Sequence, residues 1–365
     1  MIFCSECFRD VELKAAIEVL GKRGTCQVCG KKNALVYDSV EDKDKTTIQE
    51  MMDSILEIYS SETELPENCP QSDTEEIEEK IADDWNLFNC TPTQSKQIIE
   101  AIVAESFRSR KSILTGKVWI PKMYDESYME ENTIMGKYSW EYFKRVLRDE
   151  NRFHNRFINL NVLANILRET EIEISEKGKF YRARVSDEKG YPKKEMWAPP
   201  AGMASAGRAN SKGQRCLYLC SDRDTTVKEI RARAFDYVTV ATFQLKRKIK
   251  VLDLTSIVHN SPFYKETDKV SFLANDGTLR RIQEDLAKPM SRLDSELDYL
   301  PTQYISDFSR ALGYDGIKYY STFNHKAYNI AVFNSNACEC TYRKVYKIGN
   351  LDYEMIPVKA GRVYS

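Results

Sequence analysis

The spacing of hydrophobic residues along the chain changes character near residue 172. Before this point, hydrophobic positions recur with the period of about 3.6 residues that is typical of amphipathic helices. This period predicts helices over residues 47–59, 95–111, 139–153 and 159–170. The region 90–172 is therefore expected to be a helical domain.

From Lys179 onward, the pattern shifts to short runs rich in β-branched and aromatic residues, as in β-strands. The predicted strands cover residues 179–185, 215–221, 237–245, 249–255, 316–321 and 328–333. Residues 342–358 hold two alternating runs around Gly349-Asn350 and predict a hairpin. One helix, over residues 225–235, is expected to interrupt the strands.

These patterns divide the chain into four segments. Residues 1–37 form a small unit with two cysteine pairs, 38–89 an acidic helical or linker segment, 90–172 the helical domain and 173–365 a strand-rich domain. At about 100–200 residues per domain, 365 residues are enough for two or three domains. We expect a fold of the α+β class, with a mixed β domain at the C-terminus.

Acidic residues are concentrated in the second segment. Between Asp38 and Asn89 the chain has 17 Asp or Glu and 3 Lys, a net charge of 3 − 17 = −14. Because the whole chain carries −1, the remainder carries −1 − (−14) = +13. We interpret the acidic segment as an exposed spacer or a solvated helical surface. A mimic of nucleic acid and a docking site for a basic partner are the alternatives.

Composition excludes several classes of protein. No apolar run approaches the roughly 18–20 residues of a membrane span, and the first residues do not resemble a signal peptide. We therefore expect a cytoplasmic protein in a reducing compartment, where ten dispersed cysteines do not form a disulfide scaffold. With three histidines, a histidine-rich metal centre is excluded. A net charge near zero gives no global argument for nucleic-acid binding.

Motifs of the common nucleotide-binding and hydrolase families are absent. The sequence has no GxGxxG, HExxH, GxSxG or EF-hand loop. Its nearest counterpart of a P-loop, from Gly202 to Arg208, lacks the Lys and the following Ser or Thr. Kinase, NTPase, Rossmann dehydrogenase and α/β-hydrolase activities therefore lose their main support.

Four cysteines near the N-terminus have the spacing of a zinc site. Cys4 and Cys7 form one CxxC pair, and Cys26 and Cys29 form another, with 18 residues between the pairs. In this arrangement each pair directs two sulfurs at one tetrahedral ion. Gly30 suits the positive φ that such a turn often requires. Four thiolates leave no open coordination position, so we expect structural zinc in a zinc ribbon, with a redox dithiol as the alternative.

Five chemically informative residues stand in or beside the predicted elements of the C-terminal domain. Arg182 alternates with hydrophobic residues in a strand, and Arg208 lies in a glycine-rich turn. Tyr218 lies opposite its two leucine neighbours, Glu229 lies one turn into the predicted helix, and Ser321 ends a strand. Together they suit a pocket for an anionic, aromatic ligand. Taken singly, each also has a structural explanation, such as an ion pair four residues along the helix for Glu229.

The order and spacing of these residues over about 179–334 resemble the RES family, toxins of bacterial toxin–antitoxin modules that are named for an Arg, a Glu and a Ser. The YR motif of the family corresponds to Tyr181-Arg182. Its GRWN-x-x-G motif corresponds to Gly207-Arg208-Ala209-Asn210 with Gly213, and its LYL motif corresponds to Leu217-Tyr218-Leu219. The family's helix Glu corresponds to Glu229. Its YDG-x-x-Y-x-S motif corresponds to residues 314–321, which end at Ser321, and its N-x-A-x-F motif corresponds to residues 329–333, which start at Asn329. Two features depart from the family pattern. Ala209 replaces the Trp, and a long charged stretch at about 259–300 is a candidate lid or partner surface.

The resemblance implies a fold similar to ADP-ribosyltransferase toxins and an enzyme that degrades NAD⁺, by hydrolysis or by transfer of ADP-ribose to a protein. It implies that Arg182, with Arg208, holds the diphosphate, and that Tyr218 borders the nicotinamide. Glu229 would stabilise the oxocarbenium-like transition state, and Ser321 would hydrogen-bond ribose or phosphate. The other residues expected to contact NAD⁺ are Tyr181, Asn210 and Asn329. Nicotinamide leaves as a neutral molecule, so no acid, metal or histidine is needed.

Large RES proteins resemble this layout, with a cysteine-bearing start and a helical region that is likened to HEPN domains. Ribonucleases of the HEPN type carry an R-[N/D/H]-x₄₋₆-H pattern, which Arg148-Asp149 and His154 fit. A ribonuclease with Arg148 as phosphate clamp and His154 as base is therefore a second hypothesis. A third is a zinc-ribbon binding protein with an inactive enzyme domain. We favour a scaffold, dimer surface or sensor for 90–172, since the pattern is short.

An enzyme that consumes NAD⁺ inside its own cell needs restraint. We expect an antitoxin or sensor protein as partner, with the zinc unit or the acidic segment contributing to its docking. The opposite charges of the acidic segment and the remainder also permit intramolecular masking. A protein that accepts ADP-ribose is a further partner, and a homo-oligomer is compatible with the sequence. Nothing in the sequence favours a membrane partner.

Overall fold

The structure, a computed structural model, describes residues 1–66, 74–103, 111–154, 156–176, 178–257, 261–263, 268–288 and 295–351. The chain forms two compact units. Unit 1 comprises Met1–Phe143, His154–Leu163 and Val258–Arg281, and unit 2 comprises Lys144–Phe153, Ala164–Ile257 and Ile282–Ser365. The expected helical domain thus contributes residues to both units, while the finer division into four segments stays a prediction. Among the described residues, no helix has the length and hydrophobicity needed to cross a bilayer.

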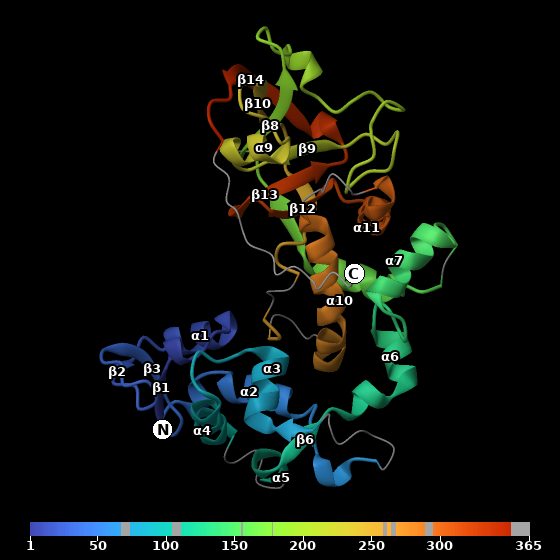
Figure 1. Ribbon diagram of the computed structural model, residues 1–365. Helices are drawn as coiled ribbons and strands as arrows, with labels where there is room; N and C mark the ends of the chain where they lie inside the picture. The colour runs from blue at the N-terminus through green and yellow to red at the C-terminus, as the bar shows by residue number, and fades with distance from the viewer. Residues whose placement is uncertain are drawn as a thin grey trace, which may run out of the picture. The chain divides into compact units, whose positions relative to one another are not determined.

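Unit 1 starts with a three-stranded antiparallel sheet that carries the N-terminal cysteines. Its order is β1 (Ile2–Cys4), β3 (Ala34–Asp38) and β2 (Arg23–Gly24). Helix α1 (Val11–Glu18) begins where the Asp10 carboxylate accepts from the backbone N–H groups of Glu12 and Leu13. The rings of Phe3, Phe8 and Tyr37 pack together beside the cysteines, with centroids 5.2–5.7 Å apart. Figure 1 shows this part of the chain in dark blue.

The rest of unit 1 consists of short helices and a second small sheet. The helices are α2 (Ile48–Leu56), α3 (Ile77–Trp85), α4 (Pro92–Val103), α5 (Lys111–Thr115) and α6 (Glu126–Asn132). The sheet has the order β4 (Ser60–Ser61), β6 (Lys117–Trp119) and β5 (Glu75–Glu76). Helices α7 (Trp140–Asp149), α8 (Leu160–Glu169) and α10 (Lys269–Ala287) contribute residues to both units.

Of the two interpretations of the acidic segment, its described parts fit the solvated helical surface, because their apolar residues belong to the core of unit 1. Ile48, Met52 and Tyr59 are fully buried and belong to the same hydrophobic cluster as residues of the N-terminal sheet and of α4. The Tyr59 hydroxyl donates to Asp84 at 2.7 Å and accepts from the indole N–H of Trp85 at 2.8 Å. The helical period explains the result, because the hydrophobic faces of α2 and α3 pack inward and leave the acidic faces to solvent.

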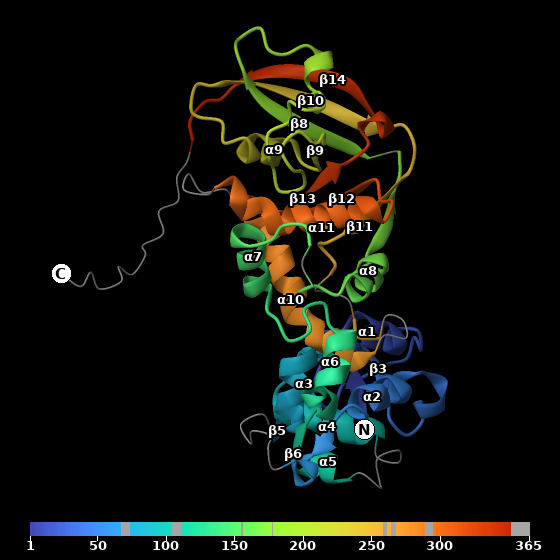
Figure 2. The ribbon, with the colours of Figure 1, turned by 90° about the vertical axis from the view of Figure 1, so that its right-hand side faces the viewer.

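Unit 2 is built on an eight-stranded mixed sheet. The strand order is β14 (Cys338–Lys347), β10 (Tyr237–Leu245), β8 (Lys179–Ser186), β9 (Leu217–Cys220), β13 (Asn324–Val332), β12 (Gly316–Ser321), β11 (Ile249–Asp253) and β7 (Glu171–Ile174). Neighbouring strands are antiparallel, except that β11 and β12 run parallel. The α+β class and the six predicted strands are confirmed. Figure 2 shows β14, the edge strand at this end of the sheet, beside β10 and β8.

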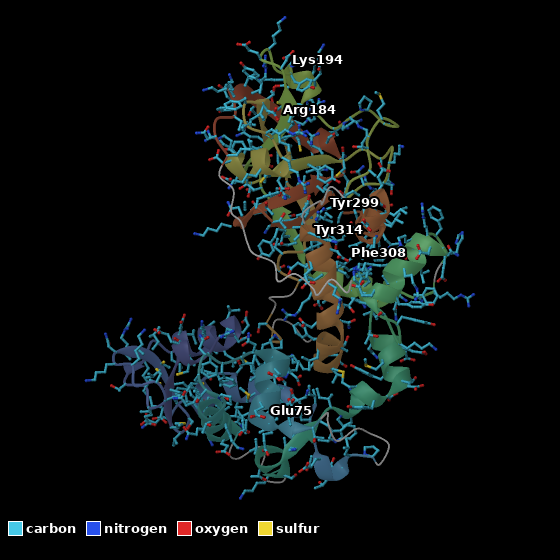
Figure 3. All side chains as sticks on the ribbon, viewed as in Figure 1. Glu75, Arg184, Lys194, Tyr299, Phe308 and Tyr314 are labelled. Atoms are coloured by element: carbon cyan, nitrogen blue, oxygen red, sulfur yellow. The ribbon has the colours of Figure 1, made fainter. Side chains whose placement is uncertain are left out.

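Hydrophobic residues cover both faces of the sheet. On one face, Ala183, Val238 and Val240 pack against Val227 and Ile230 at helix α9 (Arg223–Glu229). On the other face, a larger cluster includes Phe180, Ala241, Phe243, Met196 and Trp197. Helix α11 (Leu300–Ala311) packs against β12, and Tyr299 and Tyr314, which flank it in the chain, are both buried (Figure 3).

One predicted helix is shorter in the structure, and one predicted hairpin is described only in part. The predicted helix 225–235 ends at Glu229, because Arg231 adopts a left-handed backbone conformation with φ 51° that a helix cannot contain. Residues 342–347 of the predicted hairpin 342–358 belong to β14 and pair with β10. Its second run lies mostly outside the described residues, so the hairpin stays a prediction.

Candidate active site and metal centre

Glu229 ends helix α9 and is held by two hydrogen bonds from the neighbouring sheet. Its Oε1 accepts from Oγ of Ser321, at the end of β12, at 2.7 Å and from Nδ2 of Asn329, in β13, at 2.8 Å. The start of the helix is fixed by Asp222, whose carboxylate accepts from the backbone N–H of Thr225 at 2.7 Å. Two neighbouring strands, whose partner residues follow Glu229 by 92 and 100 positions in the sequence, therefore hold one carboxylate in a single orientation.

Glu229 lines a cavity of about 300 Å³. Arg208, Tyr319 and Asn329 line the same cavity, so the glycine-rich turn and strands β12 and β13 meet there. The other lining residues are Ile230, Arg231, Leu286, Ala287, Lys288, Tyr320, Thr322 and Phe323. Burial, together with the nearby charge of Glu229, raises the pKa of Tyr319, which therefore stays a neutral hydroxyl beside the carboxylate.

The turn that carries Arg208 is braced from two sides. The Tyr218 hydroxyl, on β9, donates to Oδ1 of Asn210 at 2.7 Å and accepts from the backbone N–H of Ala209 at 3.0 Å. From α11, Nε2 of Gln303 donates to two carbonyl oxygens of the turn at 2.8 and 3.0 Å. Burial raises the pKa of Tyr218, so its hydroxyl remains a donor. Tyr218 and Asn210 thus position the turn and are not among the residues that line the cavity as described.

The guanidinium of Arg208 contacts the C-terminal end of helix α10. Its Nη1 donates to the carbonyl oxygen of Leu286 at 2.7 Å and to that of Asp285 at 3.3 Å. A cation is favourable here, because the last carbonyl groups of a helix lack helical partners and carry partial negative charge. Lys144 contacts the Asp285 carboxylate at 3.1 Å and further fixes this end of the helix.

Arg182 and Tyr181 lie on β8, outside the lining of the cavity as described. Nη1 of Arg182 donates to the carbonyl oxygen of Tyr218 at 3.3 Å, whereas its Nε is buried without a hydrogen-bond partner in the described structure. Burial, and then the nearby Arg184, lower the pKa of Arg182 to about 10, so it stays charged at neutral pH. Tyr181 packs on the face of α9, where its carbonyl oxygen accepts from Oγ1 of Thr226 at 3.4 Å.

The structure therefore brings together part of the set expected to contact NAD⁺. The residues at the cavity are Glu229, Arg208 and Asn329, with Ser321 bonded to Glu229. The residues behind it are Tyr218, Asn210, Arg182 and Tyr181. Five lining residues with charged or hydroxyl groups were missed: Tyr319, Tyr320, Thr322, Arg231 and Lys288. Tyr319 and Tyr320 stand in the strand segment that ends at Ser321, and Thr322 directly follows it, so these three could have been found there. Arg231 and Lys288 have no local signal, because the left-handed backbone conformation at residue 231 and the end of α10 place them at the cavity.

Replacing Gly207 by Ala is expected to lower kcat/KM for the NAD⁺ cleavage that the family resemblance implies by about tenfold. A Cβ atom at this position would lie 2.7 Å from the Tyr218 hydroxyl and 2.9 Å from Oδ1 of Asn210, so the turn that carries Arg208 must shift. Steady-state kinetics with NAD⁺ checks this. Gly277→Ala in α10 is the control, because a Cβ there meets nothing within 4 Å and activity should not change. Equal activity of both variants would show that the turn tolerates the shift.

The four N-terminal cysteines form a cluster that suits a tetrahedral metal ion. Their Sγ atoms all lie within 4.8 Å of one another. The separations of Cys4 from Cys7, Cys4 from Cys29 and Cys7 from Cys26 are 3.7, 3.6 and 3.6 Å. Four sulfurs at about 2.3 Å from a zinc ion lie about 3.8 Å apart, so the cluster fits this ion closely. Gly30 has φ 74°, as the predicted turn requires.

Burial of the cluster makes free thiolates unfavourable at two positions. Burial raises the pKa of Cys4 to about 11 and raises that of Cys7 further. Burial opposes ionisation of Cys26 as well, but hydrogen bonds from the backbone N–H groups of Cys29 and Val28 and from the thiols of Cys29 and Cys7 together lower the pKa of Cys26 to about 7. A bound cation would stabilise all four sulfurs as thiolates.

The pair proposed for ribonuclease chemistry is not among the residues of the cavity or of the cysteine cluster. Nε and Nη2 of Arg148 donate to its neighbour Asp149 at 2.9 and 3.2 Å, and this ion pair is exposed. Arg148 belongs to unit 2 and His154 to unit 1. The ribonuclease hypothesis therefore stays a prediction from the sequence.

The fold and the site define unit 2 as an α+β domain with a mixed sheet, in which one firmly held carboxylate lines a cavity together with cationic and hydroxyl side chains. Residues 179–354 match the family model of the RES domain, so this part of the chain is a RES domain. A comparison with curated proteins finds no match. Among solved structures, the chain is similar to one in the crystal structure of the M. tuberculosis MbcT-MbcA toxin-antitoxin complex. The TM-score is 0.31 and the identity 9%, over 51% of this chain and 92% of that chain.

Proposed function

We propose that the RES domain breaks the bond between nicotinamide and ribose in NAD⁺. The observation that carries this proposal is the Glu229 carboxylate, fixed by Ser321 and Asn329 at the wall of a cavity that cationic and hydroxyl side chains also line. In the reaction the C–N bond breaks, its electron pair leaves with nicotinamide, and the ribose becomes an oxocarbenium-like cation. A fixed carboxylate beside that carbon stabilises the transition state more than the ground state.

The hydrogen bonds support separate roles for the two oxygens of Glu229 in this proposal. Oε1 accepts from both Ser321 and Asn329, so we assign Oε2 to the ribose, where it orients a hydroxyl or the incoming nucleophile. Ser321 and Asn329 then act through the carboxylate as positioning residues. The Tyr319 hydroxyl at the same cavity is a donor for the ribose or for the nicotinamide amide.

The nucleophile completes the reaction in one of two ways. Attack by water on the ribose carbon, with loss of a proton, gives ADP-ribose, and attack by a protein side chain gives an ADP-ribosylated target. Either reaction consumes NAD⁺ and would make the protein a toxin of a toxin–antitoxin pair. An antitoxin or sensor protein that blocks the cavity is the partner we propose for restraint.

We further propose that Cys4, Cys7, Cys26 and Cys29 hold a structural zinc ion. The cluster offers four sulfurs at tetrahedral spacing and no further donor, so the ion would stabilise unit 1 without taking part in catalysis. Zinc would link β1, η1 (Ser5–Cys7) and the turn after β2, three short elements that have little core of their own.

Incubation of the purified full-length protein with NAD⁺ tests the proposed activity. Chromatography should show nicotinamide released in proportion to NAD⁺ consumed, and ADP-ribose in equal amount if water is the acceptor. Adding a cell lysate and NAD⁺ labelled in the adenine ring shows whether ADP-ribose appears on protein. Absence of nicotinamide release under all these conditions would refute the proposed function. The His154→Ala variant should retain the activity.

A further inference from the structure

Three cations surround the part of the cavity next to Glu229. Arg208, Arg231 and Lys288 line it, and Glu229 is the single carboxylate among the lining residues described. The charges of these side chains sum to 3 − 1 = +2. A cavity with this surplus favours an anionic ligand, and a dinucleotide diphosphate carries two negative charges.

Arg208 is the cation that the sequence pattern indicates for this diphosphate, but its guanidinium is engaged elsewhere. Nη1 donates to the carbonyl oxygens of Leu286 and Asp285 at the end of α10. These bonds satisfy carbonyl groups that have no helical partner. Arg208 therefore positions the end of the helix, which places Lys288 directly after α10 at the cavity.

Arg231 reaches the cavity through an unusual backbone conformation. In a continuous helix, residues 229 and 231 would point about 200° apart, at about 100° per residue, and would not share a cavity. The left-handed conformation at Arg231, with φ 51°, ends the helix and turns the chain, so that Arg231 and Glu229 line the same cavity. This conformation normally favours glycine, and its presence at an arginine points to a function of that side chain.

We propose that Arg231 and Lys288 hold the diphosphate of the dinucleotide, while Arg208 acts as a positioning residue for the end of α10. Both side chains are exposed at the cavity wall, so neither must break a buried ion pair to bind phosphate oxygens. A guanidinium binds two phosphate oxygens at once, and an ammonium adds a mobile point charge. This assignment rests on the proposed function and places the nicotinamide ribose at Glu229 and the diphosphate beside it.

The test compares Arg231→Gly and Lys288→Gln with the wild-type full-length protein. Glycine readily adopts the left-handed conformation of residue 231, so Arg231→Gly removes the cation and keeps the turn. We expect each variant to raise KM for NAD⁺ by about tenfold, which corresponds to about 1.4 kcal/mol of binding free energy. We expect kcat to change by less than about threefold, because a diphosphate contact stabilises the bound substrate and the transition state alike. Arg233→Ala is the matched control, since Arg233 is exposed, lies two residues further on and is not among the residues lining the cavity.

A double variant tests the role of Arg208. If Arg208 acts by placing Lys288, then Arg208→Ala combined with Lys288→Gln should raise KM no more than the larger of the two single effects. Full additivity of the two effects would show that Arg208 contacts the ligand independently and would overturn its role as a positioning residue.

Binding of inorganic pyrophosphate and of ADP-ribose, measured by calorimetry, separates this inference from the proposed function. If the protein consumes NAD⁺ but Arg231→Gly leaves KM and pyrophosphate binding unchanged, the diphosphate assignment is overturned and the function stands. If NAD⁺ is not consumed but pyrophosphate binds and Arg231→Gly weakens this binding about tenfold, the function fails and the anion site stands. If NAD⁺, ADP-ribose and pyrophosphate all fail to bind to the wild-type protein, the proposed function and the diphosphate assignment are both overturned.

Discussion

Replacement of Glu229 by Gln is expected to lower kcat for nicotinamide release by at least about a thousandfold, equivalent to about 4 kcal/mol of transition-state stabilisation. The amide oxygen of Gln can still accept from Ser321 and Asn329, so the side chain keeps its position and loses only its charge. That charge is what the oxocarbenium-like transition state requires. The measurement is single-turnover release of nicotinamide, with KM determined in parallel.

Controls separate loss of charge from loss of structure. The thermal unfolding midpoint of Glu229→Gln should stay close to that of the wild-type protein. Asp224→Asn removes a carboxylate from the same helix, at an exposed position paired with Arg223, and should leave kcat unchanged. A Glu229→Gln variant that keeps more than about a tenth of the wild-type kcat would show that another group stabilises the transition state.

Loss of the N-terminal metal site should have the second large effect. The protein purified without chelator is expected to contain one zinc ion per chain, and Cys26→Ser should abolish its retention. Structural zinc contributes about 10–16 kcal/mol in small zinc-binding peptides at neutral pH, so the N-terminal part of unit 1 should unfold without it. The cysteines belong to the same buried cluster as Phe3, Phe8 and Tyr37, so the exposure of aromatic rings should report the unfolding. Elemental analysis measures the zinc content, and hydrogen exchange measures the unfolding of the N-terminal part of unit 1.

Cys90→Ser serves as the matched control for this experiment. Cys90 is half-buried in the same unit and lies close enough to Cys26 and Cys29 for their charges to raise its pKa, after burial, to about 11. It is not one of the four clustered sulfurs, so its variant should retain zinc and unfold like the wild-type protein. Zinc content that is equal in Cys26→Ser and Cys90→Ser would contradict the four-cysteine site.

The two predictions also test whether the units are independent. Glu229 and its partners lie in unit 2, and the cysteines lie in unit 1. A zinc-depleted protein that still releases nicotinamide at the wild-type rate would show that the metal site serves stability or partner binding alone. This outcome is what we expect, because no ligand position in a four-sulfur site is open to substrate.

The sequence by itself determined those features that depend on residues close together in the chain. The helical period of α2 and α4, the strands of unit 2 and the paired cysteines all follow from spacings of two to four residues. The ordered motifs around Arg208, Glu229 and Ser321 indicated the RES domain because each motif is local. Local patterns leave a choice open for the acidic segment, since its charged face fits an exposed spacer as well as a helical surface whose apolar face packs into unit 1.

Only the tertiary structure decided which residues share the cavity. Arg182 had the stronger pattern as a phosphate ligand, yet its guanidinium bonds the carbonyl of Tyr218 behind the site. No sequence pattern indicated Arg231, yet its own left-handed backbone conformation turns the chain so that Arg231 lines the same cavity as Glu229, two positions earlier. Lys288 directly follows the end of α10, and Arg208 fixes this end by a hydrogen bond to Leu286, which lies 78 positions further along the chain. Spacing along the chain fixes the side of a helix or strand on which a residue lies, but only the packing of distant elements fixes which sides meet.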